Sequence, residues 1–254
     1  MFKAASQTLV ELSRDPKYLG AEIGIISVLH TWGQNLMDHP HVHCLVPGGG
    51  LSFGGARFVR SREKFFIPVK VLSRKFRNKF LAFLKEANQD GNLKFHGKLE
   101  PLAGKFKFQA LIDGLFQKEW VVYCKKPFKS PWHALRYLGR YTHRVSISNQ
   151  RLVSLQNGHV TFTWRDYKDK KYTTKLMTLA SSEFIRRFLL HVLSSRFVKI
   201  RYYGILSNRN RNHKLRLCQK LTLSKIRMFS FRNPLFYQVI SIFHIQASLS
   251  QEFD

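Results

Sequence analysis

The pattern of hydrophobic and polar positions changes from helical to strand-like near the start of the chain. Residues 2–14 place apolar side chains at helical spacing, and residues 21–30 (AEIGIISVLH) form a β-branched, apolar run. Residues 41–46 (HVHCLV) form a second such run, which ends in Pro47 and three glycines. We therefore predict a helix and then two strands that pair antiparallel, joined by a polar connection over 32–40.

Later segments carry the helical pattern again. Residues 69–87 place Leu and Phe side chains on one face and Lys and Arg opposite, which predicts a helix. Ser130-Pro131 is typical of a capped helix start, so we expect a helix from Trp132 to about Tyr141. Ser182 is expected to cap a helix that runs through Leu193. Residues 105–118 are ambiguous.

Short apolar runs between turn residues predict the remaining strands. Gly54-Gly55 suggests one hairpin, and Asn157-Gly158 is a strong hairpin signal between residues 151–155 and 159–164. Single strands are expected over 119–124 and 197–203. Residues 221–254 are rich in Phe, Ile and Ser but lack a sustained period, so they receive no element.

Composition adds a strong basic excess to this picture. The 254 residues include 43 Lys and Arg against 15 Asp and Glu, a formal net charge of +28. A globular chain this positive attracts polyanions, and nucleic acid is the first expectation. A ribosomal-type or membrane-surface basic protein is the alternative on charge alone. Three widely separated cysteines form no metal-binding pair, and no apolar run reaches the length of a membrane span.

Three histidines suggest chemistry beyond binding. His41 and His43 flank Val42, so on a strand both imidazoles point to the same face. His30 ends the preceding predicted strand and lies beside them if the two strands pair. Three imidazoles can bind one divalent cation, and Mn²⁺, or Mg²⁺ with some reluctance, is plausible for a nitrogen-rich site. For any single histidine, an ordinary structural role is the more common one.

A tyrosine pair supplies a candidate nucleophile. Tyr137 and Tyr141 in the sequence YLGRY are one helical turn apart and share a face. A tyrosine hydroxyl, with a pKa of about 10, is a poor nucleophile at neutral pH. It becomes useful against a phosphodiester that a metal polarises, and attack conserves the bond energy in a phosphotyrosine. Aromatic packing is the commoner role for such a pair, but the combination with the histidines favours catalysis.

The histidine and tyrosine motifs together resemble the HUH endonuclease superfamily and, more narrowly, the two-tyrosine rolling-circle transposases of bacterial insertion sequences. The resemblance covers about residues 2–218 and rests on the long stretches 19–52, 129–152 and 177–211. It implies an α+β fold, in which helices pack on an antiparallel sheet with the HUH strand at its centre. It also implies a catalytic domain over 1–218, and we regard 219–254 as a divergent tail that need not belong to the fold.

The resemblance assigns a role to each candidate residue. His41 and His43 would be metal ligands, with His30 as the third, and the cofactor would be Mn²⁺ or Mg²⁺. Tyr137 and Tyr141 would be the nucleophiles. One would cleave single-stranded DNA at the end of the element, leaving a 5′-phosphotyrosine and a free 3′-OH. The other would permit a second strand exchange. We expect a cytoplasmic, nucleoid-associated bacterial enzyme that has no membrane partner.

The sequence also departs from the family pattern at both ends. The usual cysteine-rich, zinc-binding beginning is absent, and residues 221–254 carry none of the further metal-ligand residues expected there. We therefore expect a chain shortened at both ends, which encodes the chemistry but not the complete transposition reaction. The oligomeric state cannot be predicted.

Two other functions are compatible with the sequence. A rolling-circle replication initiator or relaxase would use the same chemistry without integration. A non-catalytic basic nucleic-acid-binding protein, or an inactive transposase remnant, would use its arginines for phosphate contacts alone. The candidate DNA-binding residues are Arg140, Arg144, Arg209 and Arg211. Trp32 and Trp132 could stack on unpaired bases, although burial in the core is the commoner role of tryptophan.

Overall fold

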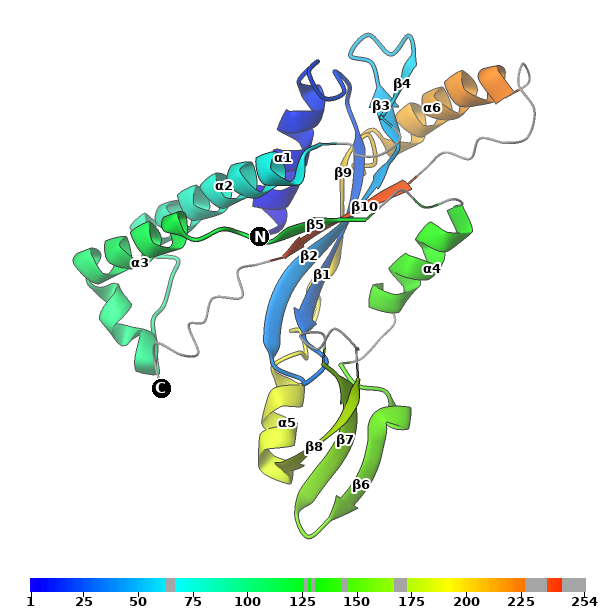
Figure 1. Ribbon diagram of the computed structural model, residues 1–254. Coiled ribbons are helices and arrows are strands. Elements are labelled where there is room, and N and C mark those ends of the chain that lie inside the picture. Colours follow the sequence, from blue (N-terminus) through cyan, green and yellow to red (C-terminus); the bar gives the residue numbers. More distant parts are fainter. Residues whose placement is uncertain are drawn as a thin grey trace.

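The computed structural model describes residues 1–62, 67–125, 128, 131–142, 146–166, 173–226 and 237–243. Its central feature is an antiparallel five-stranded sheet of order β5-β10-β2-β1-β9 (Figure 1). Helices pack on this sheet, so the predicted α+β class is confirmed, and the histidine-bearing strand is the middle one. The strands are β1 (Gly24–Trp32), β2 (Asp38–Pro47), β5 (Val122–Cys124), β9 (Ile200–Gly204) and β10 (Tyr237–Phe243).

The alternation of side chains along β1 and β2 divides the sheet into two chemically different faces. Ile23 and Ile25, just before and in β1, and Val42 and Cys44 of β2 are fully buried in the main hydrophobic core. The intervening residues of each strand point to the opposite face. There Val28 pairs with His43, and His30 pairs with His41. The predicted antiparallel pairing is thus confirmed, with all three candidate ligands on one face.

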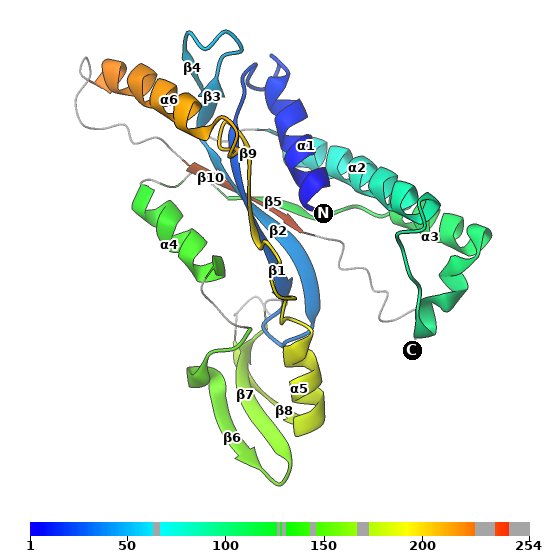
Figure 2. The ribbon, with the colours of Figure 1, turned by 180° about the vertical axis from the view of Figure 1, so that it is seen from behind.

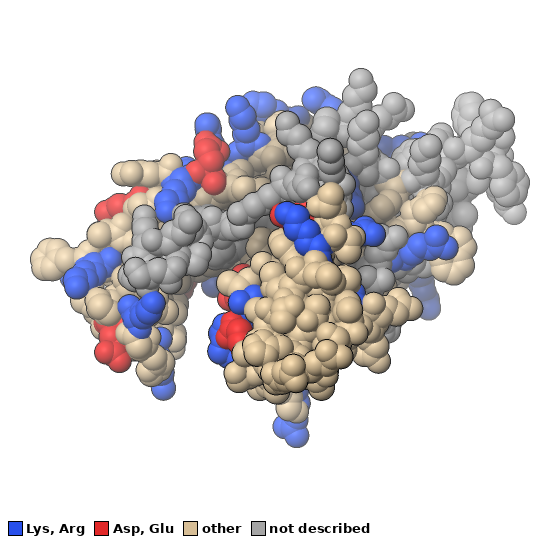
Figure 3. All heavy atoms as spheres, turned by 60° about the horizontal axis from the view of Figure 1, so that its bottom comes forward, with Lys and Arg blue, Asp and Glu red and all other residues tan. Residues whose placement is uncertain are grey.

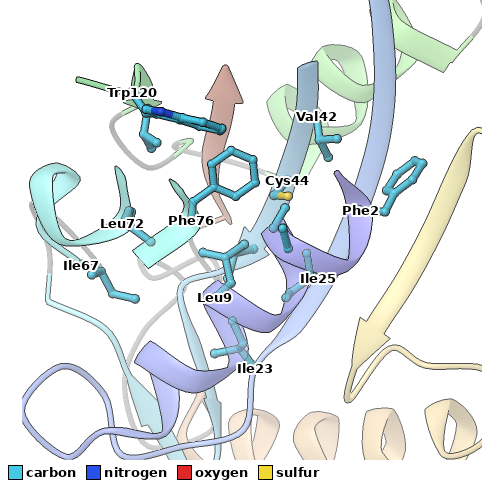
Figure 4. Close-up of a cluster of buried hydrophobic side chains, with 14 of the residues drawn as sticks. Phe2, Leu9, Ile23, Ile25, Val42, Cys44, Ile67, Leu72, Phe76 and Trp120 are labelled. Atoms are coloured by element: carbon cyan, nitrogen blue, oxygen red, sulfur yellow. The ribbon is translucent and has the colours of Figure 1, made fainter. Parts of the chain in front are cut away.

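Helices α1 (Phe2–Arg14) and α2 (Val69–Gln89) cover the apolar face of the sheet (Figures 1 and 2). Figure 4 shows how their side chains meet those of the strands: Leu9, Leu72 and Phe76 turn toward the sheet residues. Both helices carry apolar side chains on one face only, so burying that face provides most of the driving force for their packing. These two helices cover the apolar face of the sheet, and the histidines lie on the opposite face.

Helix α4 (Pro131–Thr142) lies on the opposite side of the sheet from α1 and α2 (Figures 1 and 2). Its Ala134 and Tyr137 are buried against Leu45 of β2, with Ile26 of β1 partly buried beside them. These residues belong to the same face as the histidines. The helix predicted over 132–141 is therefore confirmed, and its packing brings Tyr137 to the histidine face.

Two smaller units lie at opposite ends of the central sheet (Figure 1). At one end, the β3–β4 hairpin packs against α6 through Leu51, Phe58 and Leu217. At the other end, the β6-β7-β8 sheet carries α5, and most of its visible surface is neither basic nor acidic (Figure 3). The elements are β3 (Gly49–Leu51), β4 (Phe58–Arg60), α6 (Arg211–Ile226), β6 (Leu152–Gln156), β7 (His159–Arg165), β8 (Thr174–Ala180) and α5 (Ser181–Leu189).

Several element boundaries differ from the sequence prediction. The ambiguous residues 105–118 form α3 (Lys105–Gln117), which follows the 3-10 helix η1 (Gly97–Ala103), and η2 (Asn149–Arg151) precedes β6. Helix α5 begins at Ser181 without a side-chain cap and ends at Leu189 rather than Leu193. Two residues beyond the helix end, His191 is buried, and its Nε2 donates to the Leu36 carbonyl oxygen at 3.0 Å.

The division at residue 218 stays a prediction, although two observations bear on it. Helix α6 runs across that position, from Arg211 to Ile226. Strand β10 comes from the region to which the sequence assigned no element, and it pairs with β2 from Tyr237↔Pro47 to Phe243↔His41. Within the described part of the chain, no helix has both the length and the apolar character needed to cross a membrane.

The glycines after the histidine motif allow close backbone approach. A Cβ atom on Gly50 of β3 would lie 2.5 Å from the Glu22 carbonyl oxygen, and one on Gly49 would lie 2.3 Å from that of Val59. Neither contact can relax cheaply, because both oxygens belong to the backbone. Strand packing therefore accounts for these two glycines.

We predict that Gly50→Ala lowers the free energy of unfolding by about 1–3 kcal/mol, because the added methyl group forces the backbones apart. Urea denaturation would measure the change. Gly54→Ala is the matched control, since a Cβ there meets nothing within 4 Å and should change stability little. Equal losses in the two variants would contradict this account of Gly50.

Candidate active site and metal centre

Three imidazoles converge on one face of the β1–β2 pair. His30 of β1 lies directly opposite His41 of β2, and His43 is two residues further along β2 on the same face. Their potential ligand atoms all lie within 4.8 Å of one another. The ring centroids of His41 and His43 are 4.7 Å apart, and that of His30 is 4.8 Å from His41. The pairing predicted from the sequence therefore produces the predicted cluster.

The spacing of this cluster fits a divalent cation. The Nε2 atoms of His41 and His43 are 3.0 Å apart. Two nitrogens bound to one ion at right angles, each about 2.1 Å from it, are separated by about 3.0 Å. The ring of His30 lies farther from that of His43, with centroids 5.7 Å apart. The donor set, three imidazoles, suits a transition metal such as Mn²⁺ better than Mg²⁺.

A backbone carbonyl orients one of the ligand rings. Nδ1 of His41 lies 2.7 Å from the carbonyl oxygen of His39, at the start of β2. A carbonyl oxygen only accepts hydrogen bonds, so His41 carries a proton on Nδ1. In the neutral ring, Nε2 then presents its lone pair to the cluster. A hydrogen bond of this kind fixes the tautomer of a metal-ligating histidine.

Burial keeps two of the rings neutral. The pKa of His43 falls to about 3, chiefly because burial disfavours the charged ring, and also because His41 and Lys125 add positive charge nearby. The pKa of His30 falls to about 2 for the same principal reason, with His41, His43 and Lys199 adding to it. Both rings therefore keep an unprotonated nitrogen at neutral pH, which is the form that binds metals.

The hydroxyl of Tyr137 reaches this cluster from α4. Its oxygen lies 3.1 Å from Nδ1 of His43, and the two rings meet edge to face. The Tyr137 side chain is only 7% exposed, held between Leu45, Ala134 and the ring of Phe128. Nζ of Lys125 lies 4.8 Å from the centre of the tyrosine ring. A phenol oxygen is thus fixed beside a potential metal ligand, with an ammonium group near its ring.

The structure brings together only some of the predicted residues. The backbone of Arg140 and Tyr141 belongs to α4, but both side chains lie outside the described residues, as does the whole of Arg144. Arg209 and Arg211 are exposed around the start of α6. They follow β9 at the end where Gly204 pairs with Gly24, whereas the histidines lie toward the other end of β1. The structure therefore does not place these two arginines at the imidazole cluster.

Sequence reasoning missed several residues around the cluster. His39 supplies the carbonyl that orients His41. Lys125 places positive charge beside His43, and Lys199 does so beside His30. His39 stands in the same alternating series as His41 and His43, so its face could have been found from the sequence. Burial was the commoner expectation for Trp132 but is wrong, because this side chain is 78% exposed.

Comparison with known proteins identifies relatives over most of the chain. A family model named Y2_Tnp, described as "Putative transposase", matches residues 24–214. The chain is 50% identical over 223 residues to "Putative transposase y4qJ" of Sinorhizobium fredii. The aligned region covers 87% of this chain and 55% of that relative. It is 29% identical over 213 residues to "Transposase for insertion sequence element IS801" of Pseudomonas savastanoi pv. phaseolicola. Here the aligned region covers 82% of this chain and 48% of that protein.

The chain therefore spans about half the length of these curated relatives. No solved structure matches it.

The lowered pKa of His43 predicts a pH-dependent loss of stability in the metal-free protein. The unfolded chain takes up a proton on this ring near pH 6.5, whereas the folded chain does so only near pH 3, so stability falls as pH drops below 6.5. Between pH 7 and pH 5.5, His43 alone should lower the free energy of unfolding by about 1 kcal/mol. Urea denaturation in EDTA would show a smaller decrease for His43→Asn than for the wild type.

The matched control for this measurement is His213→Asn on the exposed side of α6. It should keep the pH dependence of the wild type. If His43→Asn does so as well, burial does not keep this imidazole neutral.

Proposed function

The chain belongs to the Y2 transposase family, and we propose that it is a metal-dependent enzyme that nicks and transfers single-stranded DNA at the ends of a mobile element. One observation carries the proposal: the hydroxyl oxygen of Tyr137 lies 3.1 Å from Nδ1 of His43, which is one of three clustered potential metal ligands. The reaction would pass through a 5′-phosphotyrosine, which retains the energy of the phosphodiester bond for rejoining.

His30, His41 and His43 are the residues that would hold the cation, with Mn²⁺ favoured over Mg²⁺ by the donor set. A divalent cation at this position supplies Lewis-acid polarisation of the scissile phosphate. When Nε2 of His43 serves as a ligand, the single proton of its neutral ring sits on Nδ1. That N–H then donates to the oxygen of Tyr137 and stabilises negative charge there, as the phenol becomes a nucleophile.

The proposed step exchanges one phosphate ester for another. The bond from the Tyr137 oxygen to phosphorus forms, and the bond from phosphorus to the 3′-oxygen of the DNA breaks. The phenol gives up its proton to water, and the departing 3′-oxygen takes one from water. Lys125, over the Tyr137 ring, places positive charge beside the phenol on which negative charge develops.

We propose Tyr137 as the first nucleophile, because its hydroxyl already lies beside a ligand. Tyr141 stands one helical turn further along α4 and would accept the second strand. The overall charge of +28 would draw DNA toward the protein through long-range attraction. A replication initiator or relaxase could use the same site, but the similarity to two transposases favours transposition.

We predict that Tyr137→Phe abolishes covalent capture of DNA. Labelled single-stranded oligonucleotides from the DNA flanking the gene, incubated with protein and Mn²⁺, should yield an adduct that survives SDS. The substitution removes only the hydroxyl and keeps the buried ring, so a loss on the order of 10³-fold or more would reflect chemistry rather than packing. Tyr123→Phe, at an exposed position of β5, is the matched control.

Peptide mapping of the adduct separates the two tyrosines. Attachment at Tyr137 in the wild type is expected. An adduct found only on Tyr141 would reverse the proposed order of the nucleophiles. An undiminished adduct in the double variant Tyr137→Phe with Tyr141→Phe would exclude both residues as nucleophiles.

Removing one imidazole should weaken metal binding and cleavage together. Isothermal titration calorimetry with Mn²⁺ should detect one site in the wild type, and we expect His41→Ala to lower its affinity by about 100-fold or more. Binding to single-stranded DNA in EDTA should survive, because phosphate contacts supply it. His213→Ala, exposed on α6, is the control. Full cleavage in EDTA by the wild type would rule out the metal requirement.

A further inference from the structure

The site residues form a row along the strands. On the histidine face, Ile26 pairs with Leu45, Val28 with His43, and His30 with His41. The register then shifts before Trp32, whose ring contacts that of His30. Levels two residues apart on a strand are separated by about 6.6 Å. Tyr137 packs on Leu45 and contacts His43, so it stands at one end of this row. Trp32 stands at the other end, and the three imidazoles lie between them.

Trp32 combines an aromatic surface with a nearby cation. Its half-buried indole contacts the His30 ring, with centroids 4.2 Å apart. Nζ of Lys199 lies over the ring of Trp32, 4.9 Å from its centre. The backbone of Lys199 is held in place, because its carbonyl oxygen accepts a hydrogen bond from the Leu29 N–H at 3.1 Å. An unpaired base stacks on such a ring when the lysine turns from the ring face to the phosphate of the same nucleotide.

A buried histidine adds an acceptor next to the indole. The ring of His191 lies 5.9 Å from that of Trp32, and the residue is 8% exposed. Its Nε2 donates to the Leu36 carbonyl oxygen, so the neutral ring has a lone pair on Nδ1. Among the described residues, Nδ1 has no hydrogen-bond partner. A buried acceptor without a donor costs free energy, so this side chain is held there by its packing and by the Leu36 contact.

We propose that Trp32 and Lys199 form the binding site for the nucleotide on the 5′ side of the scissile phosphate. The inference rests on the proposed function and adds the direction in which the bound DNA strand runs across the site. In an in-line displacement, the departing oxygen lies opposite the attacking one. Tyr137 attacks from the His43 end of the row, so the 3′-oxygen departs toward the Trp32 end. The nucleotide that leaves with the free 3′-OH therefore stacks on Trp32, and Lys199 contacts its phosphate.

The test removes the base and the indole separately and then together. Cleavage by the wild type first locates the scissile phosphate. Oligonucleotides that lack a single base at each position around it are then bound to the Tyr137→Phe variant, which leaves them uncut. Loss of the base immediately 5′ of the scissile phosphate should weaken binding by about 5- to 150-fold, the effect of one base–aromatic stack.

In the Trp32→Ala variant of the same protein, loss of that base should have little further effect, because its partner is already missing. Trp32→Phe should restore part of the sensitivity, which a purely structural tryptophan would not do. Phe106→Ala is the matched control, since that exposed aromatic side chain lies on α3 and should leave the sensitivity unchanged. Lys199→Met should reduce the slope of log binding constant against log salt concentration by about 0.7, the value for one lost phosphate contact on a single strand.

The outcomes distinguish this inference from the function on which it rests. If the wild type neither cleaves nor captures DNA, the proposed function fails and the subsite fails with it. If the wild type cleaves but the sensitive base lies 3′ of the scissile phosphate, the strand runs in the opposite direction. If the base 5′ of that phosphate matters equally in the wild-type and Trp32→Ala backgrounds, Trp32 is not its stacking partner. In both of these last cases the proposed function stands.

Discussion

The antiparallel register of β1 and β2 is the constraint on which the candidate site depends. It sets His30 against His41 and Val28 against His43, so three imidazoles share one face of the sheet. A shift of the pairing by one residue would turn the histidines of one strand into the apolar core and bring its core residues to the site. The packing of α1 and α2 behind Val42 and Cys44 opposes such a shift, because the core has room only for apolar side chains there. The hydrophobic layer on one face thereby fixes the chemistry on the other.

Burial and charge act together on the imidazoles. The desolvated rings and the nearby lysines disfavour protonation, so His30 and His43 stay neutral, and the His39 carbonyl fixes the proton of His41 on Nδ1. Neutral rings with directed lone pairs are suited to a divalent cation. Helix α4 contributes the other half of the site, since the contacts that bury Tyr137 against Leu45 also carry its hydroxyl to His43. The Tyr137 side chain thus both anchors α4 on the sheet and supplies the candidate nucleophile.

The sequence predicted the parts of the site that depend on local periodicity. Strand alternation placed His41 and His43 together, and helical spacing placed Tyr137 on α4. It did not predict Lys125 or Lys199, because each reaches the site from a segment far away in the sequence, and lysines are numerous in this chain. Strand β10 was missed for a related reason: it is inserted between β2 and β5, and its residues show no sustained alternation. Local patterns cannot specify such tertiary approaches.

The central claim is that one cation bound by His30, His41 and His43 lies beside the attacking hydroxyl of Tyr137. Anomalous diffraction from crystals grown with Mn²⁺ tests it most directly, because manganese can be located independently of the protein atoms. The account predicts one principal manganese peak bonded to a nitrogen of each of the three imidazoles, with the Tyr137 oxygen still hydrogen-bonded to His43. A principal peak elsewhere, or one at this cluster with the Tyr137 hydroxyl turned away from His43, would contradict it.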